Sequence, residues 1–177
     1  KTIDNDYKGI DFTFGYFTAV EMMATQARNL LADSQAAGAW FICQLMGRAA
    51  GWLTYGAAIG GEASLAIGTE DIDESWWCTE EAIDPGTGEK LKDDDGNVVM
   101  RKIFDVTKLV DRVTDLLIAR DAEGKGYGVV LMAEGLSEFL PVEEILGARM
   151  PQRKMPHPNT PLEWLPTACR RSNCLPS

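Results

Sequence analysis

The chain has 177 residues, a formal net charge of −10 at pH 7 and a hydrophobic fraction of 45%, which is ordinary for a soluble globular protein with a sizeable core. The charge argues against nucleic acid or an anionic membrane as the main partner, because both need a basic face. It leaves room for a phosphorylated small molecule, which needs only a few cations and backbone N–H groups.

The sequence shows little indication of a signal peptide, a membrane span or a zinc site. No basic run followed by an apolar run opens the chain, so we expect a cytoplasmic protein without a signal peptide. The most apolar long stretch, residues 49–68, contains five glycines and Glu62, which makes it a poor membrane span. The spacing of Gly56 and Gly60 instead predicts close packing of a soluble helix. The cysteines show no CxxC spacing and His157 is the only histidine, which argues against a zinc site.

The first half of the chain alternates between helical and strand patterns. Apolar residues at three- and four-residue steps predict a helix over about 15–35. These residues are Phe14, Phe17, Val20, Ala24, Ala27 and Leu31. A short buried strand is predicted over 39–45, a buried helix over 49–60 and a second buried strand over 63–68.

Segment 72–103 has a different sequence pattern, in which the turn sequences Asp-Pro-Gly and Asp-Gly-Asn separate short runs with β propensity. We interpret it as a hairpin-like insertion. Its KDDDGN sequence resembles calcium-ligand material, but no acidic residue stands where a calcium loop needs its final bidentate glutamate. A solvated turn is therefore the better prediction.

A further helix is predicted after Asp105, its N-cap, with Gly124 as C-cap, and a strand follows over about 127–132. The alternation of strands and helices predicts a parallel sheet with helices on its faces. Residues 147–177 hold six of the eight prolines and show no periodicity. We expect a poorly ordered tail there, either a true appendage or the product of a shifted reading frame, and the abrupt change in composition favours the second.

Three groups of polar residues stand where such a sheet presents its ligand-binding edge, outside the carboxyl ends of the strands. They are the opening loop with Lys1, Thr2, Asp4 and Asp6, the Met46-Gly47-Arg48 sequence, and Glu134. Each alone is better explained as a cap, a surface charge or a turn. Their joint occurrence at strand ends is harder to attribute to chance.

These residue types suit transfer of a phosphoryl group to a sugar hydroxyl, which depends on positioning and charge stabilisation. Asp4 could accept the hydroxyl proton, and Lys1 and Arg48 could supply cations for the transferring group. Asp6 is a candidate carboxylate for Mg²⁺, and Glu134 could accept hydrogen bonds from sugar hydroxyls. Spacing alone does not name the reaction.

The sequences KTIDND, KGIDFTFGYFTAV, MGRAAGWLTYGAAI and VVLMAEG, in this order, closely resemble the phosphofructokinase family over roughly residues 1–140, apart from the insertion. The resemblance implies a three-layer α/β fold with a mainly parallel sheet, truncated at both ends. It implies a partial phosphofructokinase domain over 1–146, followed by a non-family tail over 147–177.

The resemblance also implies phosphorylation of fructose 6-phosphate at its 1-hydroxyl, a glycolytic reaction. Asp4 would be the catalytic base, Thr2 and Arg48 would assist the transferring group, and Asp6 would support Mg²⁺. Met46, Gly47 and Glu134 would line the sugar site. The intact protein is expected to be a homo-oligomer.

The residue before TIDND separates two branches of the family, glycine in ATP-using members and lysine in pyrophosphate-using ones. Lys1 therefore implies pyrophosphate as donor, and a compact ammonium fits beside a small, highly charged donor. The alternatives are an ATP-dependent member with an atypical lysine and a non-catalytic, sugar-phosphate-binding subunit.

The resemblance has gaps. The family's glycine-rich donor loop and its downstream sugar-phosphate residues are missing, and Ala39 stands where ATP-using members carry an arginine. We expect the chain by itself to be inactive.

Overall fold

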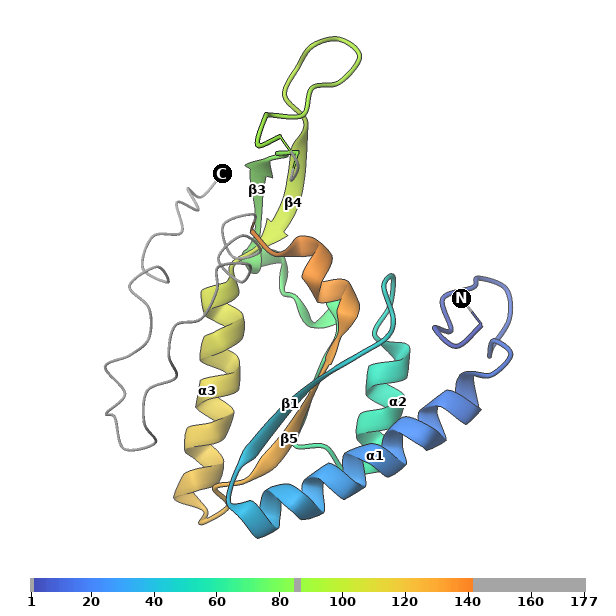
Figure 1. The fold of residues 1–177 in the computed structure, drawn as a ribbon, viewed down its shortest axis with the longest axis vertical. Coiled ribbons are helices and arrows are strands. Elements are labelled where there is room, and N and C mark those ends of the chain that lie inside the picture. The colour runs from blue at the N-terminus through green and yellow to red at the C-terminus, as the bar shows by residue number, and fades with distance from the viewer. Residues whose placement is uncertain (1, 85–86, 142–177) are drawn as a thin grey trace. The chain divides into compact units, whose positions relative to one another are not determined.

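The computed structural model describes residues 2–84 and 87–141 (Figure 1). These residues form two compact units, each described by itself below. The first comprises residues 2–74 and 112–138, and the second comprises 75–111 and 139–141. Lys1 and the predicted tail over 147–177 lie outside the described residues. No helix within the described ranges is long and apolar enough to cross a membrane.

A parallel sheet of three strands forms the centre of the first unit. Its order is β1 (Trp40–Leu45), β5 (Gly128–Ala133) and β2 (Leu65–Ile67). Trp40 pairs with Gly128 at one end of the β1–β5 ladder, and Leu45 pairs with Ala133 at the other. Because β5 lies between two partners, it is almost wholly buried and its sequence, GVVLMA, is nearly all apolar. The predicted parallel sheet is confirmed.

Helices flank this sheet, with α1 (Tyr16–Ala37) and α2 (Trp52–Gly61) packed against each other on one side in Figure 1. Three glycines of α2 face small or branched residues of α1. A Cβ added to Gly56 would lie 2.9 Å from a methyl of Val20, and one added to Gly61 would lie 2.5 Å from the Cβ of Ala27. The close packing predicted from the Gly56 and Gly60 spacing is thus confirmed.

Two residues assigned to the apolar face of the first helix are not buried. Phe14 is 92% exposed and Phe17 is 60% exposed, whereas Ala24 and Ala27 are buried. Phe14 precedes the helix, which begins at Tyr16. In the α1–α2 contact, glycines of α2 face Val20, Ala24 and Ala27 of α1, and the absent side chains of the glycines let the two backbones approach closely. The prediction was wrong for both phenylalanines.

Strand β1 is also less buried than predicted. It lies at an edge of the described sheet, and Ile42 is 63% exposed while Leu45 is buried. Periodicity identified the strand but could not indicate its place in the sheet.

Helix α3 spans Val106–Ala122, close to its predicted extent. The Asp105 carboxylate accepts a hydrogen bond from the Thr107 amide at 3.0 Å, as expected of an N-cap. Gly124 adopts φ 74° just beyond the helix, which is the left-handed conformation of a helix-terminating glycine. Both predicted helix ends are confirmed. Short 3-10 helices span Thr69–Asp71, Glu74–Trp76 and Glu134–Phe139.

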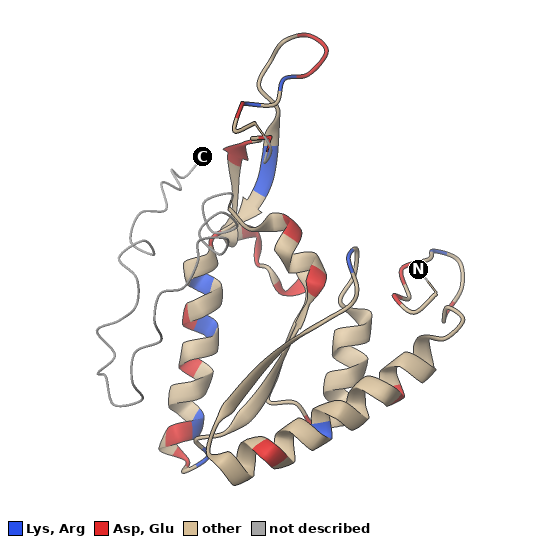
Figure 2. Ribbon diagram, in the orientation of Figure 1, with Lys and Arg blue, Asp and Glu red and all other residues tan. Residues whose placement is uncertain are grey.

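An antiparallel hairpin dominates the second unit, with β3 (Trp77–Glu81) paired to β4 (Met100–Phe104). The Arg101 guanidinium bonds the Glu80 carboxylate across the pair, and Phe104 is fully buried. The acidic turn, red at the end of the hairpin in Figure 2, is closed by Asp93, whose Oδ1 accepts from the amides of Asp95 and Asn97. Among the residues described, no group of three or more His, Cys, Asp or Glu side chains is placed to hold a metal ion.

Candidate functional site at the carboxyl edge of the parallel sheet

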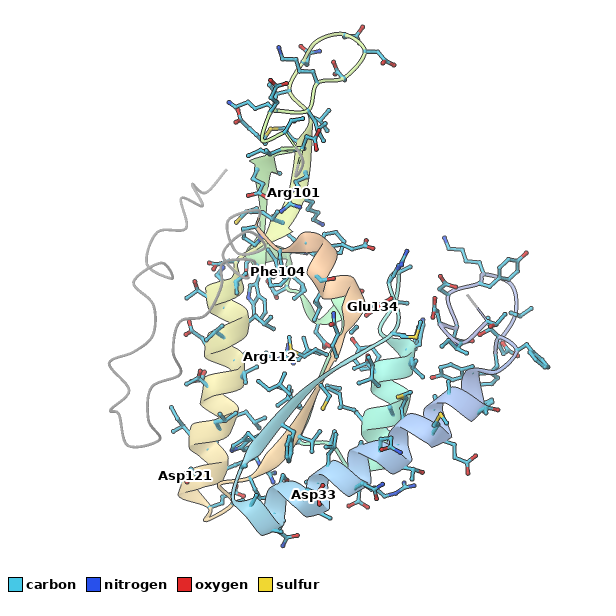
Figure 3. All side chains as sticks on the ribbon, viewed as in Figure 1. Asp33, Arg101, Phe104, Arg112, Asp121 and Glu134 are labelled. Atoms are coloured by element: carbon cyan, nitrogen blue, oxygen red, sulfur yellow. The ribbon has the colours of Figure 1, made fainter. Side chains whose placement is uncertain are left out.

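The ends of β1 and β5 bring two of the three predicted groups together. Because the strands are parallel neighbours, the segments that follow them emerge side by side. The Gly135 amide donates to the Gly47 carbonyl at 3.1 Å. Arg48 Nε lies 3.6 Å from Glu134 Oε1, so the cation and the carboxylate predicted for the site form an ion pair (Glu134 is labelled in Figure 3).

This junction leaves no space for side chains at its two glycines. Gly47 adopts φ 128°, a conformation that L side chains rarely take, and an added Cβ would lie 2.7 Å from the Ala50 carbonyl oxygen. A Cβ on Gly135 would collide with the Arg48 carbonyl oxygen. The close approach of the two backbones fixes the positions from which the side chains of Arg48 and Glu134 project.

The Arg48 side chain remains accessible. It is 79% exposed, whereas that of Glu134 is 30% exposed. An ion pair this open contributes about 0–1 kcal/mol, so it does not lock the guanidinium in place. Met46, beside Gly47, is exposed as well. The arrangement offers an exposed cation and a half-buried carboxylate, loosely paired with each other, to a ligand at this edge.

The opening loop is shaped by Asn5, a residue that the sequence argument passed over. Its Oδ1 accepts from the Thr13 amide at 2.9 Å and its Nδ2 donates to the Asp11 carbonyl at 3.4 Å. Asn5 adopts φ 55°, which asparagine tolerates better than most residues. The clue in the sequence was an asparagine between two aspartates. Asp4 and Asp6 flank this anchor and are partly buried, and Thr2 is exposed.

A buried tyrosine joins the start of α1 to the start of α2. The Tyr16 hydroxyl donates to the Trp52 carbonyl at 3.0 Å, and burial raises the pKa of this hydroxyl. It therefore stays protonated and keeps donating at neutral pH. The opening loop leads into α1 and the β1–α2 loop into α2, so both loops lie at the same end of the unit (Figure 1).

A second polar network at this edge was also missed. It follows β2 and contains Glu70 and Asp71, together with Tyr55 of α2 and Arg112 of α3. Both oxygens of Glu70 accept from the amide of Gly51, at 3.0 and 3.1 Å. Its donors come from separate segments of the chain, namely the Gly51 amide, the Tyr55 hydroxyl and the Arg112 guanidinium, so no local sequence pattern predicts the network.

The candidate metal carboxylates are few. Within the described residues no cluster of three or more His, Cys, Asp or Glu could hold an ion. Mg²⁺ commonly takes one or two protein carboxylates, with water and substrate phosphate oxygens completing its octahedron. A single carboxylate such as that of Asp6 is therefore compatible in type with Mg²⁺ bound together with a phosphorylated substrate.

Comparison with known proteins gives one family. The family model "Phosphofructokinase" matches residues 1–83. The chain is 32% identical over 148 residues to a pyrophosphate–fructose 6-phosphate 1-phosphotransferase of Naegleria fowleri, covering 82% of the chain and 29% of the relative. It is 26% identical to a β subunit of this enzyme from Solanum tuberosum, covering 85% of the chain and 22% of the relative. An ATP-dependent 6-phosphofructokinase of Chloroflexus aggregans is 24% identical, covering 76% of the chain and 28% of the relative.

The chain thus spans less than a third of the length of these relatives. Among solved structures, a phosphofructokinase from Saccharomyces cerevisiae matches with a TM-score of 0.51 at 20% identity, covering 83% of this chain and 16% of that one. This match supports the α/β fold, with its parallel sheet flanked by helices.

Proposed function

Since this chain belongs to the phosphofructokinase family, its first 83 residues matching the family model, we propose that it forms part of an enzyme that phosphorylates fructose 6-phosphate at the 1-hydroxyl. The observation that carries this proposal is the meeting of Arg48, Gly47 and Glu134 at the carboxyl edge of the parallel sheet. Cation and carboxylate side by side suit a ligand with both phosphoryl and hydroxyl groups.

The sugar would be held beside Glu134, whose carboxylate accepts hydrogen bonds from hydroxyl groups, with Met46 and Gly47 lining the site. Arg48 would contact the oxygens of the transferring phosphoryl group, where a guanidinium stabilises developing charge. Its exposure leaves it accessible for this role.

Asp4 would accept the proton of the 1-hydroxyl as the hydroxyl oxygen attacks phosphorus and the bond to the leaving phosphate breaks. Thr2 would assist the same phosphoryl group. Asp6 would support Mg²⁺, which when bound neutralises phosphate charge. The anchoring of Asn5 to Thr13 supports this role, because it holds the loop that carries both carboxylates.

Pyrophosphate is the donor that we propose. Lys1 precedes the TIDND sequence, and relatives named for pyrophosphate are 26–32% identical to the chain, against 24% for the ATP-dependent relative cited above. ATP is the second candidate. A non-catalytic sugar-phosphate-binding subunit is less favoured, because binding alone needs neither Asp4 nor Arg48. The intact enzyme is proposed to be a cytoplasmic homo-oligomer.

The test is a donor assay on the full-length protein that carries this segment. Fructose 1,6-bisphosphate formation is measured with fructose 6-phosphate, Mg²⁺ and either pyrophosphate or ATP, in wild type and in Lys1→Gly. We expect turnover with pyrophosphate, and a loss of about tenfold or more with this donor in Lys1→Gly, the size of effect that one charge-assisted contact gives. Turnover with ATP but not with pyrophosphate would show that ATP is the donor. Sugar-phosphate binding without turnover would favour the non-catalytic alternative.

A further inference from the structure

Arg48 lies in the middle of a loop whose two ends are held by other segments. At the start of the loop, the Gly47 carbonyl accepts from the Gly135 amide at 3.1 Å. At its end, the Gly51 amide donates to both carboxylate oxygens of Glu70. Within the part of the chain that the structure describes, the Arg48 side chain makes only an open ion pair with Glu134. Its position therefore depends on the backbone of this loop.

The contact between the Gly51 amide and the Glu70 carboxylate is close, and this carboxylate comes from outside the helix that it caps. Gly51 precedes α2 as its N-cap and has no capping side chain of its own. A Cβ on Gly51 would lie 2.9 Å from both a Glu70 oxygen and the Gly68 Cα. A carboxylate from the segment after β2 thus caps the helix that follows the Arg48 loop, where its charge also favours the helix dipole.

Asp71 holds the same segment in place. Its Oδ2 accepts from the Tyr55 hydroxyl at 2.7 Å and from the Gly68 amide at 2.8 Å. Burial and the Asp71 hydrogen bond raise the pKa of Tyr55, so its hydroxyl donates throughout the physiological range. Arg112 donates to the Asp71 carbonyl at 3.4 Å (Figure 3 labels Arg112). Glu70 is thereby presented to Gly51 by a segment that is itself fixed on both sides.

We propose that Glu70 is a positioning residue for Arg48. It would act through the Gly51 amide to hold the β1–α2 loop against the end of β5, so that the guanidinium stands where the phosphoryl group is transferred. This inference rests on the proposed function for its catalytic consequence. Its structural part, control of the loop by Glu70, can be measured without any substrate.

The first measurement is hydrogen exchange of the amides of residues 47–51 in the 177-residue chain, in wild type, Glu70→Ala and Glu70→Gln. A hydrogen bond to a charged group is worth about tenfold or more in a local opening equilibrium. We expect Glu70→Ala to speed exchange of the Gly51 amide by about this factor while the amides of β5 keep their rates. Glu70→Gln, which keeps an acceptor, should recover much of the protection. Unchanged exchange in Glu70→Ala would overturn the proposal.

The second measurement is steady-state kinetics on the full-length protein. Glu70→Ala should lower kcat about tenfold and change the KM for fructose 6-phosphate less than about threefold, because the displaced group acts on the transferring phosphoryl. Glu70→Gln should restore part of kcat, and Glu21→Ala, an exposed carboxylate of α1, should match wild type. A loosened loop with wild-type kcat would overturn the positioning role. Failure of the wild type to turn over would instead refute the proposed function, leaving the exchange data to decide the control of the loop.

Discussion

Asn5 and Asp4 are neighbours in the opening loop, and we give Asn5 a structural role and propose a catalytic role for Asp4. Asn5 closes the opening loop through its side-chain amide, reaching the backbone of Thr13 and Asp11. We assign chemistry to Asp4, which stands next to this anchor. Asparagine has nearly the same shape as aspartate, but its amide cannot act as a base. Replacing Asp4 by asparagine therefore tests the role of Asp4.

Asp4→Asn in the full-length protein should lower kcat for phosphoryl transfer by about 10²–10⁴-fold, the usual contribution of a general base. The KM for fructose 6-phosphate should change little, because shape and polarity are preserved. Steady-state kinetics check this, with Asp11→Asn, an exposed aspartate of the same loop, as the matched control. Turnover within about tenfold of wild type would remove Asp4 from the role of base.

Residues at strand ends could be nominated from the sequence, because parallel strands deliver their following loops to one edge. Arg48 and Glu134 were nominated in this way and do meet. Asn5 and Glu70 were missed because each binds a backbone amide, 8 and 19 residues away respectively. Backbone donors look alike at every position, so a sequence pattern cannot indicate which one a side chain will reach.

At the scale of elements, the contact between α1 and α2 depends on glycines, which have no side chain to keep the helices apart. Gly61 faces Ala27 and the backbone of Ala24, with no space for another carbon. The existence and type of both helices followed from periodicity. The burial of their faces did not, because exposure of Phe17 and burial of Ala27 depend on how closely two particular helices approach.

Gly61→Ala should destabilise the chain, although glycine-to-alanine changes in helices usually stabilise by about 0.5–1 kcal/mol. Forcing a carbon into this contact should cost about 1–3 kcal/mol, since the neighbouring atoms include backbone that cannot rotate away. Urea unfolding followed by circular dichroism measures the difference. Asn29→Ala, on the exposed side of α1, should stay within about 0.5 kcal/mol of wild type. A stabilised Gly61→Ala variant would show that the helices can separate at little cost.

At the scale of the whole molecule, the chain divides into a parallel α/β unit and a hairpin unit. The hairpin's far end, residues 87–97, is exposed throughout, and its turn is closed by Asp93. The sequence indicated this hairpin through its turn residues, because Asp-Gly turns depend on local backbone preferences.

Among the aspartates of the hairpin and of α3, an Asp-specific protease should cut first at Asp93, Asp94 or Asp95. Exposed turn tips are the usual sites of nicking, whereas Asp111 and Asp115 lie within α3 and need the helix to open. A time course read by intact-mass spectrometry, with Asp93→Asn/Asp94→Asn/Asp95→Asn as control, checks this. Earlier cleavage at Asp111 or Asp115 would mean that α3 opens more readily than the turn.

The order of the strands has a consequence for synthesis on the ribosome. β1 and β2 are not neighbours, and the strand that joins them, β5, is made last of the three. At about 5–20 residues per second, some seconds separate the emergence of β2 from that of β5. During this interval neither earlier strand can pair with its partner in this sheet. The parallel sheet of the described residues therefore closes only after β5 has been made, so its formation depends on contacts far apart in the sequence.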